Sequence, residues 1–430
     1  MLPLGRSSLA LKTDATRPRF IAGSRIVTER KSGTSEPRVL FVYWGRRGLS
    51  ELVLRLADAV TAAPIAHAAF SISRQNDRFG DLLHLGDALE PVDTFRSSGG
   101  ALFCAWRMRR LSEQILTRLR RDRIDTVVLL MPHVWEHVLA RAVKKAGARL
   151  ITVVHDAIPH PGDLRSLIAS WCTRGFHNSD LVIALSAHVE KELRATGSVA
   201  GHRLRRLFLP ELRLQPVASP AFPAPGEPFR VLFMGRILPY KGLDMLIDAV
   251  ELLRREGVAV QLGVFGEGNL GKNCERLSAM GAEVVNRWLA AEEMSAILAR
   301  YHAVVLSHTE ASQSGVASLA LGHGLPVVSN PVGGLVEQIE YGVTGIIAER
   351  VDAIALAGAI KQVAQNPRVY ARLVAGIQHS QESRSVHAFL AGLARHISEL
   401  RTNRPIQERL TPAALYEMCA LTASEGEIAT

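Results

Sequence analysis

The sequence predicts an α/β protein with two doubly wound, Rossmann-like domains. The chain has 430 residues, more than one hydrophobic core usually serves, so two domains are expected. Short apolar segments alternate with helical patterns in two separate runs, which is typical of parallel sheets covered by helices. Between the two runs, six prolines within the nineteen residues from Pro210 to Pro228 predict a stiff linker.

Both runs contain apolar segments of strand length bounded by turn residues. The predicted strands of the first run are Val39–Tyr43, Thr126–Met131, Leu150–Val154 and Leu181–Leu185. The predicted strands of the second run are Val231–Met234, Ala259–Phe265, Val284–Val285, Ala303–Leu306, Pro326–Ser329 and Gly345–Ala348. Helical patterns from Ala353 to Leu400 close the second run.

These runs divide the chain into five parts. An N-terminal Rossmann-like domain at residues 37–209 is followed by the linker at 210–228 and a C-terminal Rossmann-like domain at 229–400. Residues 1–36 carry arginine and serine without clear periodicity and are predicted to be a disordered basic extension. Residues 401–430 are predicted to be a weakly ordered tail.

Composition and charge limit the classes of function. No run of about 18 uncharged apolar residues occurs, so no transmembrane helix is predicted. The four cysteines are far apart, which fits a reducing, cytoplasmic compartment and offers no metal or disulfide framework. Residues 1–210 hold 32 Lys/Arg against 19 Asp/Glu, a balance of +13, whereas residues 211–430 hold 19 against 22, a balance of −3. This asymmetry predicts that the N-terminal half meets an anionic surface.

Two motifs place chemistry at the carboxyl ends of predicted strands, where open α/β sheets bind ligands. After Val231–Met234 the chain continues into Gly235–Arg236 and then Lys241–Gly242 ahead of an amphipathic helix. After Ala303–Leu306 it reaches Glu310 and a turn of small residues that ends at Val316. Two cations on one side and a helix N-terminus on the other would suit a diphosphate.

The order and spacing of these motifs resemble the C-terminal domain of the group 1 glycosyltransferases, the retaining enzymes of glycosyltransferase family 4. The resemblance rests on GR-x4-KG after a strand, an acidic loop before SGV, a G-x-P-V-V strand and a VGG-x-x-E turn. It implies the GT-B fold, in which two Rossmann-like domains face each other across a cleft. It also implies a UDP- or GDP-sugar donor, a saccharide or lipid-linked acceptor in cell-surface polysaccharide synthesis, and neither cofactor nor metal.

The resemblance further implies roles for single residues. Gly235, Arg236 and Lys241 are expected at the donor diphosphate, where fixed cations stabilise the charge that develops on the leaving group. Glu310 is expected to contact hydroxyls of the donor sugar. The backbone positions expected to bind phosphate are Ser314, Gly315 and Val316.

Further expectations concern a histidine at the end of one strand and two glycine-bearing turns. His155 ends the strand Leu150–Val154, and the family places a histidine there that faces the donor sugar and the acceptor; His160 in the same loop is an alternative. Gly48 belongs to a loop that in the family lies over the donor phosphates. The turn Gly266–Glu267–Gly268 can pass near the base, although such a short motif is weak evidence.

One departure from the family pattern keeps other functions open. A second glutamate, which holds the nucleotide ribose, is expected eight residues after Glu310, but the two ways of counting lead to Ser318 and Leu319. A non-catalytic binding or scaffold protein is therefore an alternative, as is a nucleotide-sugar epimerase of the same fold.

Two other features of the sequence have possible functional interpretations. His133-Val-Trp-Glu136-His137 fits a zinc-peptidase pattern, but five residues without a further ligand are more simply explained by a helix start. The segment Arg107–Arg123 has seven arginines, two acids and helical spacing of its apolar residues, with Trp106 just ahead. It predicts a basic amphipathic helix that contacts anionic lipid headgroups. Nucleic acid is not expected as a partner, because no aromatic-interleaved basic groove accompanies the charge.

Overall fold

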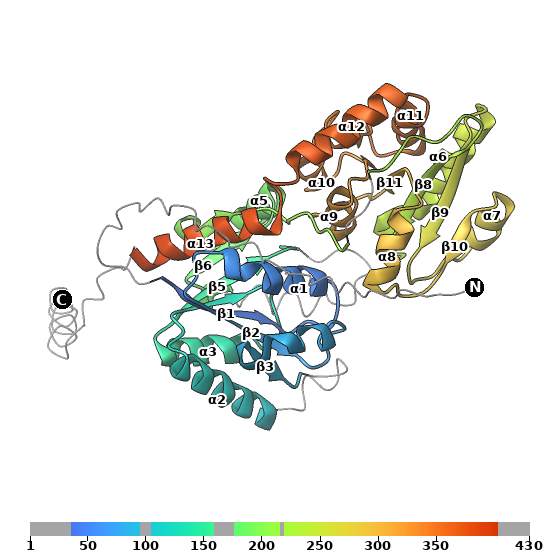
Figure 1. Ribbon diagram of the computed structural model, residues 1–430. Helices are drawn as coiled ribbons and strands as arrows, with labels where there is room; N and C mark the ends of the chain where they lie inside the picture. The colour runs from blue at the N-terminus through green and yellow to red at the C-terminus, as the bar shows by residue number, and fades with distance from the viewer. Residues whose placement is uncertain (1–35, 95–104, 159–175, 216–218, 403–430) are drawn as a thin grey trace, which may run out of the picture. The chain divides into compact units, whose positions relative to one another are not determined.

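The computed structural model describes residues 36–94, 105–158, 176–215 and 219–402, all of which lie in one compact unit (Figure 1). The predicted extension, apart from Glu36, and the predicted tail, apart from residues 401 and 402, lie outside these ranges. No helix among the described residues is long and apolar enough to cross a membrane.

The first sheet has seven parallel strands in the order β3-β2-β1-β4-β5-β6-β7. Their bounds are β1 Arg38–Tyr43, β2 His67–Ser73, β3 Leu89–Val92, β4 Thr126–Leu129, β5 Arg149–Val154, β6 Leu181–Ala184 and β7 Leu204–Arg206. The four strands predicted for this region correspond to β1, β4, β5 and β6. Strand β2 was missed because its buried face includes Ser71 and Ser73, which interrupt the apolar pattern.

Helices cover both faces of this sheet. Their bounds are α1 Ser50–Ala59, α2 Ala105–Arg121, α3 Glu136–Ala146, α5 Ala187–Ala195 and, from the C-terminal end, α13 Val386–Thr402. Helices α2 and α3 pack with Leu40 and Val42 of β1, whereas α1 and α13 share a core with Val39 and Phe41. Because successive residues of a strand point to opposite faces, the two pairs of helices lie on opposite sides of the sheet, as Figure 1 shows.

The second sheet has six parallel strands in the order β10-β9-β8-β11-β12-β13. Their bounds are β8 Phe229–Met234, β9 Val260–Phe265, β10 Glu283–Val285, β11 Ala303–Leu306, β12 Val327–Ser329 and β13 Gly345–Ile347. The helices of this part are α6 Leu243–Arg255, α7 Asn273–Ala279, α8 Ala291–Leu298, α9 Gly315–Gly322, α10 Leu335–Gln338, α11 Ala353–Ala364 and α12 Pro367–Ser380. All six predicted strands are present, with ends shifted by no more than two residues.

Local capping explains several of the helix starts. Side chains of Ser314, Asp352 and Asn366 accept hydrogen bonds from backbone N–H groups in the first turns of α9, α11 and α12. Pro367 occupies the first position of α12, where its missing N–H costs nothing. These starts are therefore encoded within a few residues of each helix.

Backbone hydrogen bonds hold the start of the proline-bearing segment between the sheets. The N–H of Glu211 donates to the Arg384 carbonyl at 2.8 Å, and that of Leu212 donates to the Ser318 carbonyl at 3.1 Å. Helix α13 then returns to the first sheet, where Phe389 packs edge-on against Phe208. Helix α13 therefore shares its core with the N-terminal sheet.

Helix α2 confirms the predicted basic amphipathic helix, and its apolar face packs into the core of the protein. Leu111, Ile115 and Leu119 are buried in the core, so they cannot enter a lipid layer. Arg118 is also buried and forms ion pairs with Glu90 and Asp122, at 3.3 and 2.5 Å. The side chain of Trp106 lies outside the described part of the structure.

Candidate active site

The two sequence motifs meet at the carboxyl ends of β8 and β11, and three glycines make the close approach possible. Gly235 has φ +108°, and a Cβ there would lie 3.3 Å from Cγ2 of Val316. A Cβ on Gly242 would lie 2.0 Å from the Ser307 carbonyl oxygen, and one on Gly266 would lie 1.9 Å from the Gly235 carbonyl oxygen. Side chains at these positions would force the loops apart.

Lys241 is the most perturbed cation of the site. Its Nζ lies 2.8 Å from Nε2 of His308. Burial, reinforced by the nearby charge of Arg236, lowers the pKa of Lys241 to about 8, and Asp156 opposes this shift. Two cations close together in a partly buried position favour the binding of an anion.

The N-terminus of α9 supplies hydrogen-bond donors beside these cations. The Ser314 side chain accepts from the N–H of Ala317, while the Gln338 side chain bonds both the N–H and the carbonyl of Ser314, at 2.9 and 2.8 Å. Within the described residues, the N–H groups of Gly315 and Val316 have no partner, and a Cβ on Gly315 would meet nothing within 4 Å. The helix start is therefore rigid and open to an incoming acceptor.

Glu310 and His155 approach this region from different strands. Glu310 lies in the turn between β11 and α9 and is partly buried. His155 follows β5, and its Nδ1 lies 2.6 Å from Nε2 of Gln313. Burial lowers the pKa of His155 to about 4, with Asp156 opposing the shift, so the ring is neutral at pH 7. His160 falls outside the described residues.

The glycine loop after β1 reaches the second sheet through an arginine. Gly48 has φ +100° and the preceding turn is fastened by Tyr43, whose hydroxyl donates to the Arg47 carbonyl at 2.5 Å. The Arg47 guanidinium lies 4.3 Å above the Trp288 ring and 3.6 Å from the Glu267 carboxylate. The loop and the Gly266–Glu267–Gly268 turn are thus neighbours, although they lie far apart in sequence.

Neither position of the expected second glutamate takes part in this cluster. Ser318 is fully buried, and its hydroxyl donates to the Pro210 carbonyl. Leu319 is buried in the hydrophobic core. Both side chains therefore hold α9 to its surroundings, and a ribose would need another partner.

Residues of the zinc-peptidase pattern are buried in contacts with the rest of the protein. His133 is buried, with Trp44 and Trp135 edge-on at ring centroid distances of 5.6 and 6.0 Å, and burial lowers its pKa to about 4. Glu136 is buried and accepts a hydrogen bond from Thr152 at 3.3 Å, and burial raises its pKa to about 8. Among the described residues, no group of three or more His, Cys, Asp or Glu side chains could hold a metal ion.

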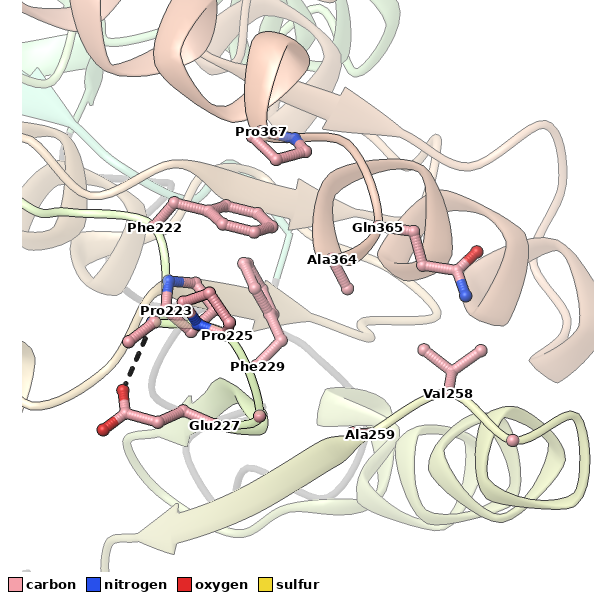
Figure 2. A pocket seen from close by; sticks show the side chains of 13 residues that line it. Phe222, Pro223, Pro225, Glu227, Phe229, Val258, Ala259, Ala364, Gln365 and Pro367 are labelled. Carbon is pink, nitrogen blue, oxygen red and sulfur yellow. Dashed lines mark hydrogen bonds between the residues drawn. The ribbon is translucent and has the colours of Figure 1, made fainter.

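Two cavities lie outside the motifs or at their margin. The first, of about 390 Å³, has mostly apolar walls that include Phe222, Pro225 and Phe229, and it contains no residue of either motif (Figure 2). The second, of about 440 Å³, is bordered by Gln313 and Gln338. No local pattern in the sequence indicates Gln313, His308 or Gln338, because each contacts a partner more than twenty residues away.

Residues 228–366 match the family model for group 1 glycosyl transferases. The D-inositol 3-phosphate glycosyltransferase of Pseudarthrobacter chlorophenolicus is 32% identical over 198 residues, which are 42% of this chain and 47% of that protein. The amylovoran biosynthesis glycosyltransferase AmsK of Erwinia amylovora is 28% identical over 150 residues, 32% of this chain and 37% of that protein. The chain spans about half the length, or less, of these curated relatives.

Solved structures share the arrangement over most of the chain. Sucrose-phosphate synthase from Thermosynechococcus elongatus has a TM-score of 0.65 at 17% identity and covers 86% of this chain and 100% of its own. Anabaena Alr3699/HepE in complex with UDP and glucose has a TM-score of 0.63 at 16% identity, with coverage of 86% and 100%. A putative UDP-N-acetylglucosamine 2-epimerase from Listeria monocytogenes has a TM-score of 0.57 at 14% identity, with coverage of 85% and 98%. At these identities the likeness establishes the fold alone, and it confirms the predicted GT-B fold.

Proposed function

We propose that this chain is a group 1 glycosyltransferase, the family whose model residues 228–366 match. It would transfer a sugar from a UDP- or GDP-sugar to a saccharide or lipid-linked saccharide. Such a reaction would serve cell-surface polysaccharide synthesis, would retain the anomeric configuration and would need no metal. The likeness to HepE, which was solved with UDP and with UDP-glucose, supports a nucleotide-sugar donor.

The observation that carries the proposal is the placement of Lys241 and Arg236 beside the open start of α9. A lysine whose pKa falls to about 8 is held at a cost in free energy, which a bound anion would remove. A diphosphate would meet two cations on one side and the N–H groups of Gly315 and Val316 on the other. As the bond between sugar and phosphate breaks, the same groups would stabilise the charge growing on the leaving diphosphate without reorganising.

A panel of nucleotide sugars followed by thermal shift tests the donor. A donor at a hundred times its Kd should stabilise the fold by about 2.7 kcal/mol, because it binds only the folded chain. Free UDP or GDP should compete with it. A chain that responds to no nucleotide sugar and no nucleotide would contradict the proposal.

Two alternatives make different predictions in the same panel. A scaffold protein is favoured by Ser318 and Leu319, which leave the ribose without the expected acid, and it would bind donor with no chemistry. An epimerase would interconvert free nucleotide sugars without an acceptor. Slow hydrolysis of the donor in the absence of acceptor would instead support a transferase.

We also propose a peripheral location at the cytoplasmic face of an anionic membrane, with a lipid-linked acceptor. Helices α2 and α3 pack together. We call the exposed cations on these two helices the basic face; Glu113 is the single exposed acid among the described side chains of the two helices. The cations of the basic face are Arg107, Arg109, Arg110, Arg120 and Arg121 of α2 and Arg141, Lys144 and Lys145 of α3. Since the apolar face of α2 is buried, the attraction to lipid headgroups would be electrostatic, about 1 kcal/mol for each well-placed cation.

Binding to vesicles tests this location with two matched sets of four substitutions to glutamine. The basic-face variant changes Arg109, Arg110, Arg120 and Arg121. The control variant changes four exposed cations of the second sheet region, namely Arg255, Lys272, Arg368 and Arg372.

A further inference from the structure

Gln313 holds the ring of His155 in a way that determines which nitrogen carries the proton. One atom of the Gln313 amide lies 3.1 Å from the His155 carbonyl oxygen and 2.6 Å from the ring Nδ1. A backbone carbonyl oxygen only accepts hydrogen bonds, so the atom of Gln313 that faces it must be the NH₂ group. The orientation of the amide therefore follows from the backbone contact alone.

The same NH₂ group sets the tautomer of His155. Because an NH₂ group donates, the Nδ1 that it contacts must be the unprotonated, accepting nitrogen of a neutral ring. The proton of the neutral imidazole is then on Nε2. Within the described residues Nε2 is buried and has no hydrogen-bond partner, so this N–H lacks the acceptor that a bound ligand would supply.

We infer that Gln313 is a positioning residue that keeps His155 as a neutral hydrogen-bond donor through Nε2, directed at an oxygen of the bound donor or acceptor. His155 then does not act as a base in the reaction, because Nδ1 is occupied and Nε2 already carries a proton. The inference deepens the proposed function and rests on it for the identity of the bound oxygen. The tautomer itself can be tested without any substrate.

The charges around His155 are consistent with a neutral ring. Asp156 is the adjacent carboxylate and favours the imidazolium, but burial outweighs it and lowers the pKa of His155 to about 4. Asp156 also favours the protonated form of Lys241, whereas the positive charge of Arg236 disfavours it. The carboxylate adjacent to His155 therefore also interacts with Lys241, one of the two cations proposed to bind the diphosphate.

Nitrogen-15 NMR of histidine-labelled protein tests the tautomer directly, with the His155 signals assigned from their loss in a His155→Ala variant. In the wild type we expect Nε2 protonated, Nδ1 unprotonated, and no titration of the ring between about pH 5 and about pH 8. In a Gln313→Glu variant the new carboxylate should accept a proton from Nδ1 and raise the pKa of His155 to about 5 to 7. A wild-type ring protonated at Nδ1, or a ring whose tautomer and pKa are the same in Gln313→Glu, would overturn the inference.

The pH dependence of turnover gives a second readout with a defined sign. Below its raised pKa, His155 of the Gln313→Glu variant is an imidazolium and still donates through Nε2. Above that pKa the ring is neutral with its proton on Nδ1, so the donor is lost and kcat should fall as pH rises. Wild-type kcat should show no such fall attributable to His155, because its ring stays neutral above about pH 4.

Two further variants separate positioning from folding. Gln313→Met removes the amide, including its contact with the His155 carbonyl, without adding charge, and should lower kcat up to about a hundredfold with a smaller change in KM. Gln362→Glu makes the same change of charge at an exposed position of α11 and should leave the His155 signals and kcat unchanged. Wild-type kcat in Gln313→Met would contradict the inference.

The NMR and activity results distinguish the inference from the proposed function. If the ring behaves as expected but no nucleotide sugar reacts, the arrangement of Gln313 and His155 stands and the proposed function fails. If transfer occurs but His155 carries its proton on Nδ1, the proposed function stands and the inference fails.

Discussion

Replacing Lys241 with methionine should make the protein more stable while abolishing donor binding. Methionine keeps most of the length of the side chain and removes its charge. In the folded chain that charge is held in a partly buried position beside Arg236, which lowers the pKa of Lys241 from its ordinary value of 10.5 to about 8. A residue kept for structure alone would not be expected to carry such a cost.

The size of the effect can be worked out from two opposing contributions. The lowered pKa corresponds to about 3 kcal/mol of destabilisation while the lysine is protonated in both states. The hydrogen bond from Nζ to Nε2 of His308 is lost in the variant, which costs about 1 kcal/mol. The free energy of unfolding of Lys241→Met should therefore exceed that of the wild type by about 2 kcal/mol.

The pH dependence of this difference has a definite sign. Because the folded-state pKa of Lys241 lies below the unfolded one, the wild type gains stability as pH rises from about 8 to 10.5. The advantage of the variant is thus complete below about pH 8 and disappears at about pH 9.5, where the wild type has gained about 2 kcal/mol. Near pH 10.5 the variant should be about 1 kcal/mol less stable than the wild type, because only the loss of the hydrogen bond to His308 then remains.

Urea unfolding of both proteins at pH 7 and in steps up to pH 10, with and without nucleotide, measures these quantities. Lys272→Met is the matched control, because the Lys272 side chain is 78% exposed and its loss should change stability by no more than about 0.5 kcal/mol. A Lys241→Met protein that is no more stable than the wild type, or that still binds the nucleotide sugar equally well, would refute the assignment of Lys241 to an anion site.

Three further predictions concern the leaving group, metal and membrane. Arg236→Ala should lower kcat by about 10² to 10³ and raise KM less, since its cation acts on charge that grows in the transition state; normal turnover would remove it from the site. Activity should survive EDTA, because cations and the start of α9 act on the leaving group; loss restored by zinc would instead implicate His133 and His137. Wild-type binding to anionic vesicles should weaken as salt rises, because charge is screened over about 8–10 Å, and the basic-face variant should be released from the vesicles while keeping activity on a soluble acceptor. Equal vesicle binding by the wild type, this variant and the control variant would show that the basic face is only a solvated surface and does not bind membranes.

Much of the fold follows from local patterns in the sequence. Strand β8 contains the apolar run Val231–Met234, and α9 begins after a serine that caps it, so both can be located from a few neighbouring residues. The glycines of the first motif are needed because Gly235 and Gly242 have positive φ and lie against other loops. Residues whose partners are close in sequence, or whose backbone conformation is restrictive, are the ones that the sequence identifies.

The sequence by itself therefore determined the two doubly wound sheets and the cations and helix start at the ends of β8 and β11. Only the tertiary structure decided that Gln313 contacts His155, 158 residues away, and that Ser318 bonds the carbonyl of Pro210. It also decided that His133 contacts two tryptophans and that the apolar face of α2 is buried in the core. The physical reason is that the periodicity of the backbone is local, whereas the partner of a buried polar or apolar side chain depends on the order of the strands and the packing of distant segments.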